Sequence, residues 1–284
     1  MAREIRTVGV VGLGAMGSGI AQLAIEAGFD TIGREVELAR AEEARDRIAH
    51  FLTRKVEKGT LEQSARDDAV GRLRLTADVA DLAGCDIVIE AAFEDLAVKH
   101  ELFRELEGAV GEATILATNT SALSVTEIAS VLQHPERACG MHFFNPAPLM
   151  PLVEIVRAER TAGDVFEAAF ALGSRLGKTP ISCIDTPGFV VNRVLIPLLN
   201  DCVRVLDETG VTPEDLDAGM TYGAGWPMGP CALLDLVGAD VHVHASEALY
   251  EKLREPRMAP PPRLVRMLQA GKLGRKSGEG FYTY

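Results

Sequence analysis

The chain has 284 residues, of which 47% are hydrophobic and 25% charged, a composition that is ordinary for a soluble enzyme and long enough for two domains. Its formal net charge of −12 argues against nucleic acid as a partner and means that any polyanionic small molecule must meet a local concentration of positive charge. The first residues are polar, and the apolar run after them is broken by glycines. We therefore expect no signal peptide, no membrane span and a cytoplasmic location.

Cysteine and histidine positions argue against a metal site. The five cysteines are widely spaced and never form a Cys-x-x-Cys pair, so they are interpreted as reduced core thiols. The six histidines form no metal-spaced cluster with cysteines or acids. His242 and His244 alternate as they would in a strand and are interpreted as incidental.

The first element predicted along the chain is a valine-rich strand from Ile5 to Val11, followed by the pattern Gly-x-Gly-x-x-Gly and a helical stretch from Ser18 to Ala27. The first glycine permits a tight turn, the second lets the backbone approach a pyrophosphate, and the third lets helix and strand pack closely. The helix N-terminus offers amides to the phosphates. We predict a dinucleotide site whose contacts come from Gly12, Leu13, Gly14, Ala15, Met16 and Gly17.

A second strand is predicted from Phe29 to Arg34, and Glu35 at its end stands where a carboxylate accepts hydrogen bonds from the adenosine ribose. The 2′-phosphate of NADP would lie against that carboxylate, and the two negative charges would repel each other. The pattern therefore favours NAD over NADP. Arg34 leaves NADP tolerance open, because a guanidinium accepts a 2′-phosphate well. The alternative is a glycine-rich turn beside a solvated glutamate. It would make the three glycines, the helix start and the position of the acid a coincidence.

An insertion from Glu37 to Val70 is predicted to form two helices that meet at Lys58-Gly59-Thr60, a helical hairpin projecting from the sheet. Basic residues gather in it: Arg45, Arg47, Arg54, Lys55 and Lys58. On the residues alone, a solvated helix face balanced by neighbouring glutamates is the favoured interpretation. A binding site for a polyanion is the alternative.

Further strand-like runs alternate with helical ones, which indicates a doubly wound, Rossmann-type, mostly parallel α/β sheet over residues 1–185, the predicted NAD-binding domain. These runs are Asp86–Ala91, Thr114–Thr118, Ala138–Phe143, Leu152–Val156 and Thr179–Ile184.

Residues 186–284 are predicted to form a smaller all-α domain. An apolar stripe at helical spacing runs from Val190 to Leu206, and Pro197 should kink this helix or end its first part. Thr212 is predicted to cap a new helix, and helical patterns continue over Pro230–Leu253 and Pro262–Ala270.

The best candidate for a general base is His142, near the end of a predicted strand, where crevices of open parallel sheets form. Downstream, Glu154 interrupts an apolar strand, and a buried carboxylate is costly unless it is paired. Prolines between the two could turn the chain back, so that Glu154 meets His142 and orients its ring. The alternative is a core histidine with no catalytic role.

A second polar cluster, Asn119-Thr120-Ser121, follows the Thr114–Thr118 strand and should reach the same crevice edge. Ser124, with Glu127, fits better as the cap of the next helix. In the second domain, Asn192 interrupts an apolar helix and should face a partner or a ligand.

Six ordered motifs resemble the 3-hydroxyacyl-CoA dehydrogenase family, and the size and short C-terminal domain are most like its bacterial 3-hydroxybutyryl-CoA members. The motifs are the glycine-rich 12–22 segment, Val88-Ile89-Glu90-Ala91, Asn119-Thr120-Ser121, His142-Phe143-Phe144-Asn145-Pro146, the 187–193 segment Pro-Gly-Phe-Val-Val-Asn-Arg and the 226–230 segment Trp-Pro-Met-Gly-Pro. The resemblance covers nearly the whole chain.

The resemblance implies NAD-dependent, reversible oxidation of an (S)-3-hydroxyacyl-CoA to the 3-oxoacyl-CoA, with His142 as base or acid and Glu154 as its partner. It implies cofactor contacts from Glu35, Ala91, Glu94, Lys99, Asn119, Ser121 and His142, and substrate contacts from Ser121, Asn145, Asn192 and Lys55 or Lys58. Ser121 and Asn192 would hold the C3 oxygen, and one of the two lysines would meet the CoA phosphates, which reverses the solvated-face interpretation. A homodimer is also implied.

Two other functions remain open on the sequence. Relatives that oxidise a free hydroxy acid or sugar acid share the nucleotide-binding half, and a non-catalytic NAD-binding protein could keep the same fold. Retention of His142, Glu154, Ser121 and Asn192 together argues against a scaffold, which has no need of all four.

Overall fold

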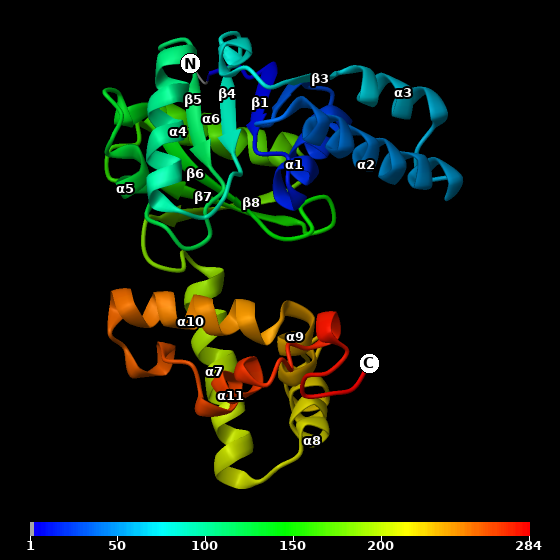
Figure 1. Ribbon diagram of the computed structural model, residues 1–284, viewed down its shortest axis with the longest axis vertical. Coiled ribbons are helices and arrows are strands. Elements are labelled where there is room, and N and C mark those ends of the chain that lie inside the picture. The colour runs from blue at the N-terminus through cyan, green and yellow to red at the C-terminus, as the bar shows by residue number, and fades with distance from the viewer. Residues whose placement is uncertain (1–2) are drawn as a thin grey trace. The chain divides into compact units, whose positions relative to one another are not determined.

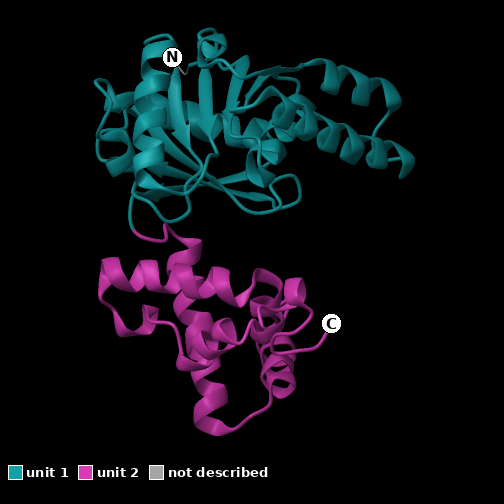
Figure 2. Cartoon of the chain, in the orientation of Figure 1, with its two compact units in different colours: residues 1–186 teal, residues 187–284 magenta. Residues whose placement is uncertain are grey.

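The computed structural model of the protein describes residues 3–284, and its contacts separate two compact units. Unit 1 ends at Thr186, and unit 2 comprises Pro187–Tyr284 (Figure 2). Each unit has a core of its own, and the two are described separately below.

Within the described residues, unit 1 is built on one sheet of eight strands in the order β3-β2-β1-β4-β5-β6-β7-β8 (Figure 1). All neighbouring strands run parallel except β6 and β7, which are antiparallel. This confirms the predicted doubly wound, mostly parallel sheet. The strands are β1 (Thr7–Val11), β2 (Asp30–Arg34), β3 (Leu73–Thr76), β4 (Ile87–Glu90), β5 (Ile115–Thr118), β6 (Ala138–Phe143), β7 (Leu152–Arg157) and β8 (Thr179–Ile184).

Helices flank the sheet, and the predicted helical hairpin is formed by α2 and α3, which extend from one side of it (Figure 1). The helices are α1 (Ala15–Glu26), α2 (Leu38–Glu57), α3 (Gln63–Gly71), α4 (Leu96–Ala109), α5 (Val125–Ala129) and α6 (Gly163–Arg175), with short 3₁₀ turns at Val79–Leu82 and Pro135–Arg137. The edge strand β3 was not predicted, because only Thr76 of its four residues is buried and the strand shows no apolar run.

The core of unit 1 lies on both faces of the sheet. Ile87 and Ile89 of β4 pack into one apolar cluster with α1 and α6, while Val88 between them packs into the other with α4 and α5. Successive strand residues point to opposite faces, so a strand covered by helices on both sides is a continuous apolar run.

Unit 2 is helical, as predicted. Its elements are α7 (Val191–Thr209), α8 (Pro213–Ala218), a π-helical turn at Gly219–Gly223, α9 (Pro230–Val237), α10 (Ala239–Leu253), α11 (Pro262–Gln269) and 3₁₀ turns at Pro256–Met258 and Arg275–Ser277. Gly238, with φ of 101°, divides the predicted Pro230–Leu253 stretch into two helices.

Helix α7 continues through Pro197, so of the two outcomes expected at this proline, a kink or an end of the helix, the end is wrong. A proline inside a helix removes one backbone hydrogen bond and costs about 3 kcal/mol. Downstream of it, Leu199, Val203 and Leu206 are buried on one side of the helix. Burial of each large apolar side chain is worth about 1.5–3 kcal/mol, which outweighs the loss at Pro197.

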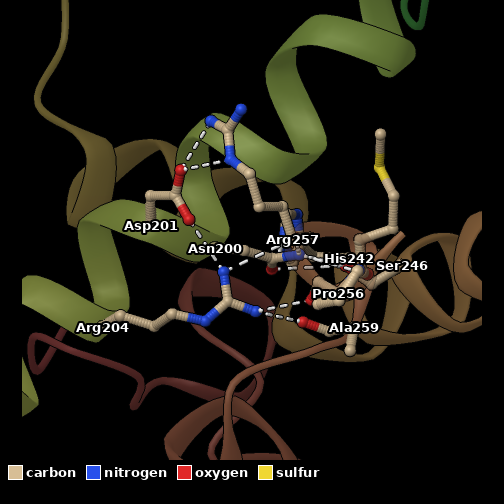
Figure 3. Close-up of polar contacts among 9 residues, drawn as sticks. Asn200, Asp201, Arg204, His242, Ser246, Pro256, Arg257 and Ala259 are labelled. Atoms are coloured by element: carbon tan, nitrogen blue, oxygen red, sulfur yellow. Dashed lines mark hydrogen bonds and ion pairs between the residues drawn. The ribbon is translucent and has the colours of Figure 1, made fainter.

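His242 lies in helix α10, which corrects the strand-like reading of its alternation with His244. Its Nε2 is 2.9 Å from Asn200 Oδ1, and the Asn200 amide donates to Ser246 Oγ at 2.9 Å (Figure 3). Arg204 donates to Ala259 O at 2.7 Å and so joins α7 to the segment before α11. These polar contacts tie α7, α10 and that segment together, with Asn200, His242 and Ser246 buried and Arg204 at the edge of the core.

Acid should weaken unit 2 through His242. Burial lowers the pKa of His242 from 6.5 to about 4, because the charged ring is poorly solvated there. The unfolded chain binds this proton at higher pH than the folded one. Stability is therefore complete above pH 6.5 and falls by up to about 3 kcal/mol as the pH decreases towards 4.

Urea unfolding followed by fluorescence of Trp226, the single tryptophan, reports on unit 2 and can be repeated across this pH range. The variant His242→Gln keeps an amide for Asn200 and has no titrating ring, so its stability should change less between pH 6.5 and 4. If the free energy of unfolding fell equally steeply with decreasing pH in both proteins, His242 would not be the group responsible.

Candidate active site

The glycine turn after β1 has the geometry that a dinucleotide requires. Gly12 has φ of +84°, in the left-handed region, and a Cβ there would be 2.8 Å from Ala91 O. A Cβ on Gly17 would be only 1.7 Å from Gly12 O, whereas one on Gly14 would meet nothing within 4 Å. The turn is thus closed by two glycines and open at the third, where a pyrophosphate can approach the backbone.

Glu35 is held at this turn. Its Oε2 accepts a hydrogen bond from Leu13 N at 2.8 Å, and its Oε1 accepts one from Val36 N at 2.9 Å. The half-buried carboxylate is therefore fixed beside the turn, at the end of β2, where it fits the ribose of a bound dinucleotide. Arg34 precedes it with a buried Nε that has no hydrogen-bond partner among residues 3–284.

The structure brings His142 and Glu154 together. They are directly opposite each other in the antiparallel β6–β7 pair, with His142 Nδ1 2.7 Å from Glu154 Oε2. The two residues are only 5% and 0% exposed. Because a carboxylate accepts, Nδ1–H donates to Glu154, and this tautomer leaves the proton-accepting lone pair on Nε2. The Cys183 thiol is a weak donor to Glu154 Oε1 at 3.8 Å.

Asn119 and Ser121 lie on the loop after β5, at the same edge of the sheet. Asn119 Oδ1 accepts a hydrogen bond from Phe143 N at 2.9 Å, one residue beyond His142. Ser121 has an exposed side chain, and its backbone amide donates to Glu94 at 2.9 Å. Ser124 caps α5 by accepting from Glu127 N at 3.1 Å, as predicted, so Ser121 is not needed as a cap.

Glu94 holds the loop after β5 through hydrogen bonds to one of its carboxylate oxygens. Its Oε1 accepts hydrogen bonds from Thr120 Oγ1 at 2.5 Å and from the amides of Ser121 and Ala122 at 2.9 and 3.1 Å. Burial alone would raise the pKa of Glu94, but these bonds and the charge of Lys99 outweigh it and hold the pKa below its usual value.

Lys99 is the buried cation of this region, with a side chain 1% exposed. Its Nζ lies 2.6 Å from Glu90 Oε1 and 3.3 Å from Glu94 Oε2. Glu90, which is fully buried, also accepts from Thr118 Oγ1 at 2.6 Å. Sequence reasoning did not single out Glu90, although a carboxylate closing the apolar run of β4 carries the same signal that identified Glu154.

A groove of about 540 Å³ lies between α1, the hairpin helix α2 and the loop after β6. Asn145 lines it together with the basic residues of α2. Lys55 in the groove is paired with Glu26. In contrast, neither the Arg54 nor the Lys58 side chain forms a hydrogen bond or ion pair with residues 3–284, and both are exposed.

Asn192 belongs to unit 2, where it is half-buried in the first turn of α7. Among residues 3–284, no three or more histidine, cysteine or acidic side chains are grouped so that they could hold a metal ion. Of the helices within that range, none combines the length and apolar character that a membrane crossing needs.

Strands of one mostly parallel sheet thus bring together a glycine turn, a ribose-fitting carboxylate and a buried histidine–carboxylate pair. This combination defines a dinucleotide-dependent dehydrogenase. Family models agree with this class. The 3-hydroxyacyl-CoA dehydrogenase NAD-binding domain matches residues 7–186, and the C-terminal domain of the same family matches residues 188–284. The chain belongs to the 3-hydroxyacyl-CoA dehydrogenase family, and its cofactor is NAD.

Individual relatives cover the full chain. A 3-hydroxybutyryl-CoA dehydrogenase of Mycobacterium tuberculosis is 43% identical over 100% of both chains, and one of Bradyrhizobium diazoefficiens is 40% identical over 100% of this chain and 97% of the other. The crystal structure of (S)-3-hydroxybutyryl-CoA dehydrogenase from Ralstonia eutropha superposes with a TM-score of 0.96 at 40% identity, covering 99% of each chain.

Proposed function

We propose that this protein interconverts short-chain (S)-3-hydroxyacyl-CoA, in particular 3-hydroxybutyryl-CoA, and the corresponding 3-oxoacyl-CoA. The observation that carries the proposal is the buried His142–Glu154 pair, placed on the same sheet edge as the glycine turn. The names of the relatives from M. tuberculosis and R. eutropha, both 3-hydroxybutyryl-CoA dehydrogenases, support the choice of substrate.

In the oxidative direction, His142 Nε2 takes the proton from the C3 hydroxyl, and in reduction it returns that proton. Glu154 fixes the ring tautomer and stabilises the imidazolium that forms, at a 2.7 Å contact shielded from water. Bound NAD supplies the hydride acceptor. Ser121 and Asn192 are proposed to donate hydrogen bonds to the C3 oxygen, where negative charge develops.

The cofactor is proposed to lie along the carboxyl edge of β1, β4 and β5. The turn from Gly12 to Gly17 would hold the pyrophosphate, and Glu35 would hold the ribose. The nicotinamide half would meet Ala91, Asn119, Glu94 and Lys99. Of these, Glu94 and Lys99 would act mainly by fixing the loop after β5 that carries Ser121, called the Ser121 loop below.

The groove beside α2 is proposed to take the nucleotide end of CoA, with Asn145 on its wall. Of the two candidate lysines, Lys58 suits a phosphate better, because the charge of Lys55 is already neutralised by Glu26. Arg54 adds a second unpaired cation to the same wall. These local positive charges would attract a polyanionic substrate to the groove even though the chain has a net charge of −12.

Replacing Lys58 with alanine should therefore raise KM for acetoacetyl-CoA by about three- to tenfold, while kcat and KM for NADH stay nearly constant. The matched variant Lys55→Ala should have a smaller effect, since this lysine already has a partner. Steady-state kinetics at low and high salt would measure KM for both variants. The increase in KM caused by Lys58→Ala should become smaller as the salt concentration rises. A larger effect from Lys55 would reverse the assignment.

The function itself can be tested by following NADH oxidation at 340 nm with acetoacetyl-CoA and, separately, with free acetoacetate. Turnover of the thioester and not of the free acid is expected. Preference for free acetoacetate, or NADH binding without turnover of either compound, would refute the proposal. Repeating the assay with NADPH tests the preference that Glu35 implies, which Arg34 leaves open.

We also infer a homodimer and a cytoplasmic location. Val190, Val194, Val237 and Val241 of unit 2 are each at least 40% exposed, and a second copy of the chain would cover such apolar side chains. Size-exclusion chromatography with light scattering tests the dimer. All five cysteines of the chain are buried and unbridged, which is compatible with a reducing compartment.

A further inference from the structure

Lys178, the residue before β8, has a side chain that the dehydrogenase chemistry does not use. It is only 8% exposed, and its Nζ donates hydrogen bonds to Ala147 O at 2.6 Å and to Met150 O at 2.8 Å. Both carbonyls belong to residues 144–151, which we call the β6–β7 loop. Burial lowers the pKa of Lys178.

A buried ammonium is costly unless it is hydrogen-bonded, so these two bonds hold Lys178 and the loop to each other. The loop is folded tightly at that point, since the amides of Leu149 and Met150 both donate to Pro146 O at 3.0 Å. Next to Lys178, Thr179 N donates to Pro151 O at 2.7 Å and so closes the end of the loop.

The loop also packs against helix α1 at Gly19. A Cβ on Gly19 would lie 3.0 Å from Pro148 Cδ and 3.1 Å from Ala147 Cβ, so a side chain there would force the loop to shift by a few tenths of an ångström. The loop is thus clamped by hydrogen bonds to a buried cation and by close packing on the bare backbone of helix α1.

This clamp shapes the groove but not the histidine pair. Asn145, Pro146, Pro148 and Leu149 of the loop line the groove beside α2. By contrast, His142 and Glu154 are opposed by the backbone ladder between β6 and β7, before and after the loop. Loosening the loop should therefore disturb the groove and leave the pair in place.

We propose that Lys178 is a positioning residue for substrate recognition: it fixes the β6–β7 loop as one wall of the groove that takes the nucleotide end of CoA. The proposal rests on the function proposed above, because it needs that groove to bind CoA. It assigns Lys178 no contact with the substrate and no part in proton transfer.

The test replaces Lys178 with methionine, which keeps the length and apolar stem but removes all three donors. KM for acetoacetyl-CoA should rise about tenfold or more, whereas kcat should stay within about threefold and KM for NADH within about twofold. The control Lys272→Met removes an exposed lysine of unit 2, paired with Glu279, and should change none of these values.

Two further measurements separate positioning from a merely structural role. Acetoacetyl-N-acetylcysteamine lacks the nucleotide, so its kcat/KM should be nearly the same in wild type and Lys178→Met. Gly19→Ala keeps the lysine charge but pushes on the loop, and it should raise KM for acetoacetyl-CoA in the same way. This second variant also serves if Lys178→Met does not fold.

Hydrogen exchange of residues 144–151 provides a readout that needs no turnover. Faster exchange confined to this loop in Lys178→Met, together with the KM effect, would support the proposal. Unchanged exchange, an unchanged KM for acetoacetyl-CoA, or an equal loss with the truncated thioester would overturn it. If wild type fails to reduce acetoacetyl-CoA at all, the proposed function fails, while the exchange experiment still decides whether Lys178 anchors the loop.

Discussion

Replacing His142 with glutamine is expected to lower kcat for reduction of acetoacetyl-CoA by about 10²–10⁴-fold, the usual contribution of a positioned general acid or base. Glutamine can still reach Glu154 with its amide, but it cannot give or take a proton at neutral pH. The glycine turn and Glu35 are untouched, so the Kd for NADH should be unchanged. Stopped-flow kinetics and NADH fluorescence titration measure these two quantities separately.

The chain offers a matched control in His134, an exposed histidine whose ring lies 3.1 Å from Glu136. His134→Gln removes a histidine–carboxylate contact of the same kind from the surface and should leave kcat within about twofold. If His142→Gln retained near-normal turnover, His142 would not be the acid or base.

Glu154→Gln tests the second half of the pair. The variant removes the charge that stabilises the imidazolium, and its NH₂ can face His142 Nδ1 and favour the wrong tautomer. A loss in kcat comparable to that of His142→Gln, with little further loss in the double variant, would show that the two act as one unit. Additive losses would show that they act independently.

Much of this site could be predicted because its signals are local. The glycine pattern dictates a turn that only glycines can form, as the positive φ of Gly12 and the closed space at Gly17 show. Glu154 could be found because a carboxylate in an apolar strand demands a partner, and His142 was the nearest chemically suitable one. The antiparallel turn that joins them depended on prolines visible in the sequence.

Other features were out of reach because they depend on contacts between distant residues. Lys178 has no sequence signal, since its partners are backbone carbonyls, which every residue carries. The difference between Lys55 and Lys58 depends on Glu26 of another helix. His242 was misread because an alternation of two histidines is short, and the buried partner Asn200 lies on α7.

Replacing Lys99 with methionine is expected to lower the free energy of unfolding of unit 1 by about 3–5 kcal/mol, because it leaves the buried Glu90 carboxylate without a counter-charge. Glu90 and Lys99 are 0% and 1% exposed at a separation of 2.6 Å, so water cannot replace the lost partner. The Ser121 loop should also loosen, since Lys99 supports Glu94, and the Kd for NADH should rise.

The double variant Lys99→Met/Glu90→Gln separates loss of charge balance from loss of packing. It removes both charges while keeping an acceptor for Thr118 Oγ1, and a buried pair replaced by neutral groups is often nearly as stable as the original. Urea unfolding followed by circular dichroism should therefore show most of the stability restored. A double variant as unstable as Lys99→Met would mean that Lys99 acts through packing.

The pH dependence adds an independent check on Glu94. Because its pKa is lowered in the folded state, Glu94 contributes stability that is complete above its usual value of 4.5 and is lost as the pH falls through the folded value. Lys99→Met removes one of the causes of that lowering. The stability difference between Glu90→Gln and the double variant Lys99→Met/Glu90→Gln, neither of which carries the Glu90 carboxylate, should therefore narrow below about pH 4.5. A difference that stayed constant down to pH 3 would show that Lys99 does not act on Glu94, and the coupling between the buried cation and the Ser121 loop would have to be abandoned.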